Sequence, residues 1–246
     1  MRTRRLIEGW PALLVAACLC LSSACAFRRG AAHPELTAAA DRQDALALSD
    51  ALEALIAAGR DTPADREYAY HIVRAHAENT APSLFARAAV TGRLVQQEGL
   101  LAAHLVPEIE GCAQRSRDLD RDFRGGAATR LLGTLYVMAP AMLLEHGNSE
   151  IGLQLLEGLA RTHPDVLENH LRLAEAYIAL GDLALAGPHL CRCLADKAAL
   201  RPDDQALLRQ LIDDARLPAC APPRTEPDDP DPAGRGTGST VRPAGP

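Results

Sequence analysis

The chain has 246 residues, of which 48% are hydrophobic but only 3% are aromatic, and its formal net charge is −6. This apolar content, mostly Leu and Ala, is sufficient for a buried core and favours closely packed helices over sheets. No long basic run follows the N-terminal arginines, so the charge pattern argues against nucleic-acid binding.

Residues 1–24 predict an export signal with three arginines at its positive end. Its apolar core, residues 11–21, is too short to span a bilayer comfortably. The signal ends in Leu21-Ser-Ser-Ala-Cys25, where small residues before a cysteine resemble the lipobox of bacterial lipoproteins. That resemblance implies that Cys25 takes a diacylglycerol on its sulfur and becomes the new N-terminus.

Lipid attachment at Cys25 would hold the protein on the periplasmic face of the cell envelope. Ala26 follows this cysteine, where an Asp would resemble an inner-membrane retention signal, so the outer membrane is favoured. Two alternatives stay open. Lipidation could occur at Cys18, after Val15-Ala-Ala, or the segment could be an uncleaved anchor or an ordinary cleaved signal.

Residues 25–36 are predicted to be a short tether, and residues 37–217 a helical domain. About nine helices are expected: over residues 41–58, 63–76, 84–97, 100–118, 127–139 and 149–162, from Asp165 to Gly181, from Asp182 onward, and over 203–216. Residues 218–246 are rich in Pro, Asp and Gly and are predicted to be disordered. No convincing strand is found, so the predicted fold class is all-α.

Several of the predicted helix ends rest on local signals. Gly59 should end the first helix, and Thr62 should cap the next one with Pro63 at its first position. Pro107 should kink or restart the fourth helix. Further caps are expected at Asn148 or Ser149, at Asp203, and at Asp165 with Glu168 in a capping box.

Two segments in the second half of the chain share one register. The equivalent positions are Leu132-Gly133 with Leu173-Ala174, Tyr136 with Tyr177, and Gly152, Leu156 and Leu159 with Ala186, Leu190 and Cys193. The second helices repeat at the ~34-residue period of tetratricopeptide hairpins. The first helices are farther apart, which places an insertion around residues 138–147. An α-solenoid, or superhelix, of degenerate tetratricopeptide-like hairpins is therefore predicted.

A family resemblance is carried by Gly125-Gly-Ala-Ala-Thr-Arg-Leu-Leu-Gly-Thr-Leu-Tyr-Val-Met-Ala-Pro140, by residues 147–152 and by residues 163–177. These segments resemble the T-component family of tripartite ATP-independent periplasmic (TRAP) transporters, over roughly residues 57–211. The resemblance implies a helical lipoprotein that associates with a periplasmic solute-binding protein. It also implies a channel that passes a hydrophobic ligand. The alternative function is a scaffold for protein–protein interaction in envelope assembly.

Six residues of the repeat region are candidates for a binding groove: Arg130, Tyr136, Asn169, Arg172, Glu175 and Tyr177. Equivalent helices of successive hairpins line one concave surface, so these side chains could bind a segment of a partner protein. Purely structural roles stay open, such as a hydrogen bond from Asn169 to a turn, or an ion pair of Arg130 with Glu168 or Glu175.

If Cys25 is acylated, four cysteines remain, an even number that permits disulfides in an oxidising compartment. Cys191 and Cys193 lie two apart on a helix and point in different directions, so they should not pair with each other. Cys193 could pair with Cys112, and Cys191 with Cys220. Buried free thiols are the alternative.

No metal, cofactor or catalytic site is expected. The spacing of Cys191 and Cys193 is wrong for a zinc knuckle, and His163, His170 and His189 match no ligand motif. The sequence shows no Gly-rich phosphate loop, nucleophile elbow or plausible carboxylate pair. The chain is therefore predicted to be non-enzymatic and to act by binding a protein partner.

Overall fold

The computed structural model describes residues 32–215 and Cys220, and these are entirely helical and irregular, with no strand. The α-helices are α2 (Pro34–Asp41), α3 (Ala45–Ala57), α4 (Pro63–Ala75), α5 (Ala81–Glu98), α6 (Val106–Leu119), α7 (Ala127–Met138), α8 (Ser149–Thr162), α9 (Leu167–Leu180), α10 (Leu183–Ala195) and α11 (Pro202–Ala215). Three short 3-10 helices join them: η1 (Gly99–Leu105), η2 (Ala141–Leu143) and η3 (Lys197–Ala199). The all-α prediction is confirmed.

The helices predicted from the sequence are all present, and most begin at the predicted signals. The Thr62 hydroxyl accepts a hydrogen bond from the Asp65 backbone N–H at 3.3 Å, and the Asp65 carboxylate accepts one from the Thr62 N–H at 2.8 Å. This reciprocal pair is a capping box. Asn148 caps α8 by accepting from the Ile151 N–H at 2.9 Å. Pro107 lies in the first turn of α6, where the chain restarts after η1.

Two of the predicted caps are wrong. The helix expected to be capped at Asp165 is α9, which begins at Leu167 and has no side-chain cap at Val166. The Val166 N–H donates to the carbonyl of His163 in a turn, which leaves Asp165 outside the helix. Asp203 lies inside the first turn of α11 rather than before it, because Pro202 begins that helix.

One helix, α2, was not expected, because its first residues belong to the predicted tether. Pro34 favours a helix start, and Leu36 and Ala39 are fully buried against the following helices. The imidazole of His33, just before α2, contacts the Asp65 carboxylate at 2.8 Å. Burial and this contact, rather than helix propensity, fix the segment in place. The predicted export signal, Cys25 and all of the predicted tail except Cys220 lie outside the described residues.

The repeat region packs as the shared register predicts. Gly133 of α7 and Gly152 of α8 face each other so closely that a Cβ at Gly152 would lie 2.7 Å from the Gly133 carbonyl oxygen. Leu156 fills the space beside them and is fully buried. Small residues at the crossing thus let the two helix backbones approach, and large ones close the gaps.

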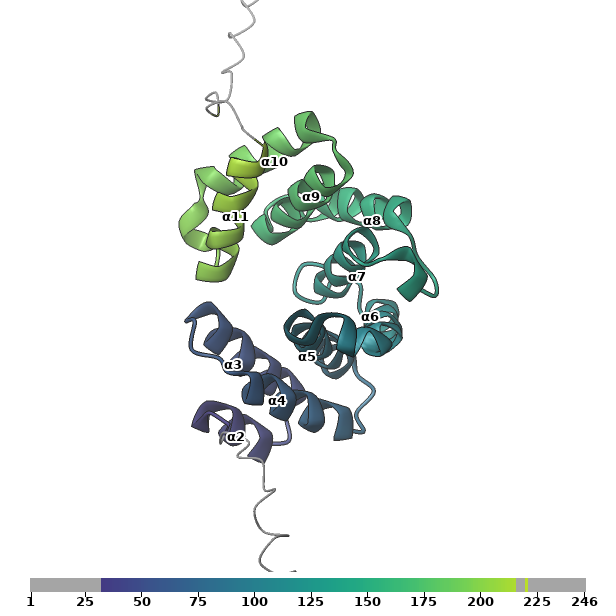
Figure 1. Ribbon diagram of the computed structural model, residues 1–246, viewed down its shortest axis with the longest axis vertical. Coiled ribbons are helices and arrows are strands. Elements are labelled where there is room, and N and C mark those ends of the chain that lie inside the picture. Colours follow the sequence, from purple (N-terminus) through teal and green to yellow (C-terminus); the bar gives the residue numbers. More distant parts are fainter. Residues whose placement is uncertain (1–31, 216–219, 221–246) are drawn as a thin grey trace, which may run out of the picture.

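The solenoid returns on itself. Figure 1 shows the helices following a curve from α2 and α3 through α5 and α7 to α10 and α11, which come back toward α3. α11 packs on α9 and α10 and also contacts α3. Within the described residues, no helix is long and apolar enough to cross a membrane.

Candidate binding surface

Arg130 and Asn169, two of the predicted groove residues on equivalent helices of successive hairpins, are in direct contact. Arg130 Nη1 donates to Asn169 Oδ1 at 2.7 Å, and Asn169 Nδ2 donates to the Gly125 carbonyl at 3.2 Å. Asn169 is fully buried, whereas Arg130 is partly exposed. The contact ties the N-terminal ends of α7 and α9 together. The two helices also pack on each other, as equivalent helices of successive hairpins in a solenoid should.

The guanidinium of Arg130 has no carboxylate within 4 Å among the described residues. Burial lowers its pKa below the ordinary value, against the opposing effect of Glu168. A guanidinium carries five N–H donors. Only one hydrogen bond to it is made within the described part of the chain, so Arg130 retains donors for a carboxylate or carbonyl of a partner.

Arg172 and Glu175 lie on the same helix as Asn169, and Arg172 is bonded to α11. Arg172 Nη1 binds the Glu175 carboxylate and Nη2 binds the Asp204 carboxylate of α11, each at 2.9 Å. Asp204 is almost completely buried. The predicted groove is therefore occupied at this point by the last helix of the chain itself.

Tyr136 and Tyr177 are buried rather than exposed in a groove. The Tyr136 hydroxyl donates to Glu110 Oε1 and the Tyr177 hydroxyl to Glu157 Oε1, both at 2.8 Å. Burial, followed by the hydrogen bond to the neighbouring carboxylate, raises the pKa of each phenol to about 12. The six predicted residues therefore do not line one groove. Arg130 and Asn169 bind each other, Arg172 and Glu175 form an ion pair beside α11, and the two tyrosines are buried. Of the charged residues among the six, Arg130 alone has no ion pair within the described part of the chain.

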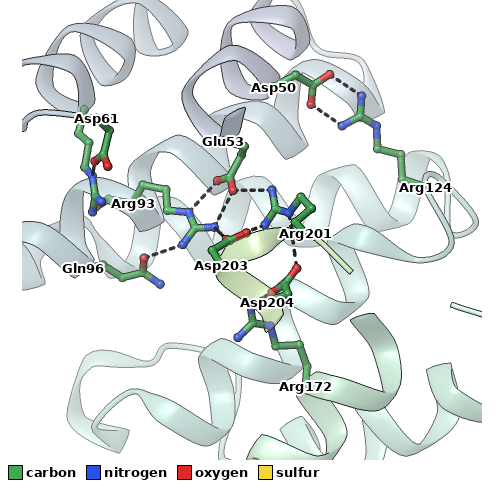
Figure 2. A network of polar contacts seen from close by, with 11 residues as sticks. Asp50, Glu53, Asp61, Arg93, Gln96, Arg124, Arg172, Arg201, Asp203 and Asp204 are labelled. Atoms are coloured by element: carbon green, nitrogen blue, oxygen red, sulfur yellow. Dashed lines mark hydrogen bonds and ion pairs between the residues drawn. The ribbon is translucent and has the colours of Figure 1, made fainter. Parts of the chain in front are cut away.

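A network that the sequence did not reveal joins the two ends of the helical curve. We define the closing network as Glu53 of α3, Arg93 of α5, Arg201, Asp203 and Asp204 of the α10–α11 region, and Arg172 of α9. Figure 2 shows Arg93 and Arg201 approaching Glu53 from either side. Arg93 donates to both oxygens of Glu53, at 2.7 and 2.6 Å, and Arg201 donates to Oε2 at 2.8 Å.

The electrostatics of the closing network favour its charged form. Burial tends to raise the pKa of Glu53, but the adjacent guanidiniums of Arg93 and Arg201 outweigh it, so the net pKa is lowered. Asp203 lies 3.1 Å from Arg201 and 3.6 Å from Arg93. Its Oδ1 atom is buried without a hydrogen-bond partner in the described structure. Glu53 and Arg201 are 148 residues apart in the chain.

A cavity of about 360 Å³ lies at the junction of α4, α5 and α6. It is lined by Val73, His76, Ala77, Glu78, Asn79, Ser83, Leu84, Arg87 and Arg115. Arg87 is paired with Glu108 at 2.7 Å. The mixture of polar and charged groups suits a polar ligand or a peptide better than a hydrophobic ligand.

The four cysteines that the structure describes divide into one bonded pair and two free thiols. Cys191 forms a disulfide with Cys220, closing a segment of 29 residues. Cys112 and Cys193 are buried free thiols, so the other pairing considered from the sequence is absent. Burial raises the pKa of the Cys193 thiol to about 12. Such a thiol is inert toward oxidants at neutral pH.

Two of the three repeat-region histidines meet across the last hairpin. The Nδ1 atoms of His170 and His189 lie 2.9 Å apart, and the His189 ring also stacks on Tyr177. His163 lies apart from this pair, 3.2 Å from Asp122. Among the described residues no group of three or more His, Cys, Asp or Glu side chains is arranged to hold a metal ion.

Comparison with known proteins leaves the family of this chain open. No family model matches it, and no curated protein is significantly similar to it. The family resemblance therefore rests on the segments between residues 125 and 177.

Proposed function

We propose that this protein is a membrane-anchored, non-enzymatic component of the periplasm that acts by binding another protein. Its proposed role is that of an accessory component of a TRAP-type solute uptake system, with a periplasmic solute-binding protein as the partner. Lipid attachment at Cys25 would supply the anchor. The resemblance of residues 125–177 to the T-component family supports the transporter assignment, and the helical-hairpin fold is compatible with it.

The observation that best supports protein binding is the fixed position of Arg130 together with its lack of an ion-pair partner among the described residues. Arg130 is partly buried and oriented by Asn169, and it has no carboxylate partner among the described residues. Arginines of this kind, fixed in position and surrounded by packed side chains, are enriched at the centres of protein interfaces. The cavity between α4, α5 and α6 has a polar lining and gives no support to a hydrophobic ligand, so such a ligand is not part of this proposal.

Affinity purification from mildly solubilised envelopes tests the proposal. The wild-type chain should retain a solute-binding protein together with its integral permease. Arg130→Gln should weaken retention at least about tenfold, as loss of a charged hydrogen bond at an interface does. Glutamine can still donate to Asn169, so the fold should be kept.

Arg124→Gln is the matched control, because Arg124 is an exposed arginine in the turn before α7 that is already paired with Asp50. It should leave retention unchanged. If both variants lost retention equally, the cause would be a general charge effect, and Arg130 would no longer be assigned as the contact for the partner. Recovery of envelope-assembly proteins in place of transporter subunits would support the alternative function as an envelope scaffold.

The anchor has its own test. Cys25→Ser should release the protein from membranes and abolish labelling by radioactive fatty acid. Continued labelling of the variant would remove Cys25 as the lipidated residue, whatever the partner proves to be.

A further inference from the structure

The three most exposed large apolar side chains of the described residues lie in the 3-10 helices η1 and η2. Leu100 and Leu101 of η1 are 83% and 84% exposed, and Met142 of η2 is 90% exposed. Other residues of η1 hold it firmly, because Ala102 and Leu105 are buried in the core beside α3 and α4. Leu100 and Leu101 are therefore displayed by a fixed segment rather than by a loose loop.

Both 3-10 helices lie toward the N-terminal half of α6. η1 leads directly into α6 at Val106. The connection that follows η2 is fixed to α6 by the Glu110 carboxylate, which accepts from the backbone N–H groups of Glu145 and His146 at 2.9 and 2.8 Å. The exposed apolar residues therefore share one edge of the solenoid, formed by the turns within its hairpins.

The described chain also begins at this edge. The backbone N–H of His33, just before α2, donates to Asp65 of the first turn of α4 at 2.8 Å. Glu35 in the first turn of α2 is paired with Arg60 of the α3–α4 turn at 3.0 Å. The start of α2 is thus fixed beside the α3–α4 turn.

The connection between α3 and α4 lies beside the C-terminal end of α5. Arg66, in the first turn of α4, donates to the carbonyl of Arg93 at 3.0 Å, about one and a half turns before α5 ends. Gly99, with a positive φ of 60°, ends α5 there and η1 follows. The entry of the chain and the exposed apolar residues therefore lie on the same edge, which we call the entry edge: the start of α2, η1 and η2.

We propose that the entry edge rests on the membrane surface, with Leu100, Leu101 and Met142 in the interfacial region of the bilayer. This inference rests on the lipid anchor of the proposed function. Cys25 precedes Pro34 by nine residues, which span at most about 30 Å when fully extended. An anchor on so short a chain keeps the entry edge close to the bilayer.

The opposite edge is a poor alternative for the membrane contact. α5 has 18 residues and is about 27 Å long. If the opposite edge faced the bilayer, the chain between Cys25 and Pro34 would have to cover this distance, which is almost its full extended length of about 30 Å. Exposed apolar side chains that share one edge are typical of membrane or protein contacts. Transfer of Leu and Met from water into the interface is favourable, and it adds to the affinity given by the acyl chains.

Tryptophan fluorescence can test this orientation, because the one Trp of the sequence, Trp10, lies in the predicted export signal. Leu101→Trp then places a single reporter on the entry edge. Leu119→Trp is the matched control: Leu119 is 57% exposed and ends α6, whose N-terminal end carries η1. The lipidated protein is reconstituted into phosphatidylethanolamine–phosphatidylglycerol vesicles, with and without brominated acyl chains.

Leu101→Trp should show blue-shifted emission and lose most of its intensity in brominated vesicles, whereas Leu119→Trp should show neither effect. Met142→Trp should behave like Leu101→Trp. Vesicle flotation separates two kinds of failure. Protein that does not float lacks the anchor, which overturns the lipid attachment and this inference together.

Protein that floats with an unquenched reporter at residue 101 overturns the orientation alone, as does equal quenching at residues 101 and 119. The emission of Leu101→Trp could also shift to the blue without vesicles, by an amount that increases with protein concentration. That result would show that the entry edge is instead a contact between copies of the chain.

Discussion

Replacing Glu53 with alanine should loosen the contact between the first and last parts of the helical curve. Its carboxylate accepts three hydrogen bonds, two from Arg93 and one from Arg201, and its side chain is only 18% exposed. In the variant, both guanidiniums would keep only Asp203 and Asp204 as counter-charges. The substitution therefore leaves partly buried positive charge without its main partner.

Removing one member of a buried ion pair costs about 3–5 kcal/mol, because the remaining charge stays desolvated. Arg201 is 40% exposed, so water replaces part of what it loses. We therefore expect a decrease of about 2–3 kcal/mol in the free energy of unfolding. Asp50→Ala is the control on the same helix: Asp50 is paired with Arg124, but both side chains are more than 40% exposed. Its loss should cost less than about 0.5 kcal/mol.

Urea denaturation followed by circular dichroism gives both free energies. Hydrogen exchange then shows whether the loss is local. Glu53→Ala should speed exchange in α11 and leave α7 and α8 unchanged, because the network reaches α11 through Arg201 and Asp203. Equal costs for Glu53→Ala and Asp50→Ala, or unchanged exchange in α11, would refute the view that the closing network holds the last helix.

Three further predictions concern packing, acid sensitivity and the disulfide. Gly152→Ala should destabilise the fold by about 1–3 kcal/mol in thermal unfolding, because a Cβ there meets a carbonyl oxygen of α7. Gly158→Ala on the same helix meets no close neighbour and should stabilise it by about 0.5–1 kcal/mol. Burial and the adjacent His170 lower the pKa of His189 below 6.5. Its neutral form is therefore favoured in the folded state, and stability should fall as the pH drops below about 6.5. His189→Gln should reduce that loss when unfolding is measured between pH 7.5 and 5. Cys220→Ser should cost about 2–4 kcal/mol by releasing the closed segment, and only the wild type should then respond to reductant.

Most of the helices could be predicted from the sequence, because local capping and terminating residues mark their ends. Thr62 with Pro63, Asn148 and Gly181 act within one or two turns, and the structure has helix ends at each of them. The predicted cap at Asp165 was wrong for an equally local reason: a turn ends at Val166, and the helix begins one residue later than expected. α2 could not be predicted, because it is stabilised by burial against helices that lie farther along the chain.

The binding surface was predictable only where the repeat defined it. The shared register placed Arg130 and Asn169 on neighbouring helices, and they are in contact. The register could not show that α11 would cover Arg172, or that Glu53 would meet Arg201. These contacts depend on the total curvature of the solenoid. Curvature is the sum of small rotations between successive helices and leaves no local trace in the sequence.

The return of α11 also limits where a partner protein can bind. A partner segment that used Arg172 would have to displace Asp204 and, with it, the last helix, which Arg201 connects to Glu53 of α3 and Asp203 connects to Arg93 of α5. Such binding would expose the partly buried charges of the closing network, at a cost comparable with the loss of Glu53. Binding at Arg130 carries no such cost, because its only described hydrogen bond, to Asn169, can remain in place. Competition between α11 and a partner therefore disfavours the predicted groove at Arg172 and leaves Arg130 as the accessible contact.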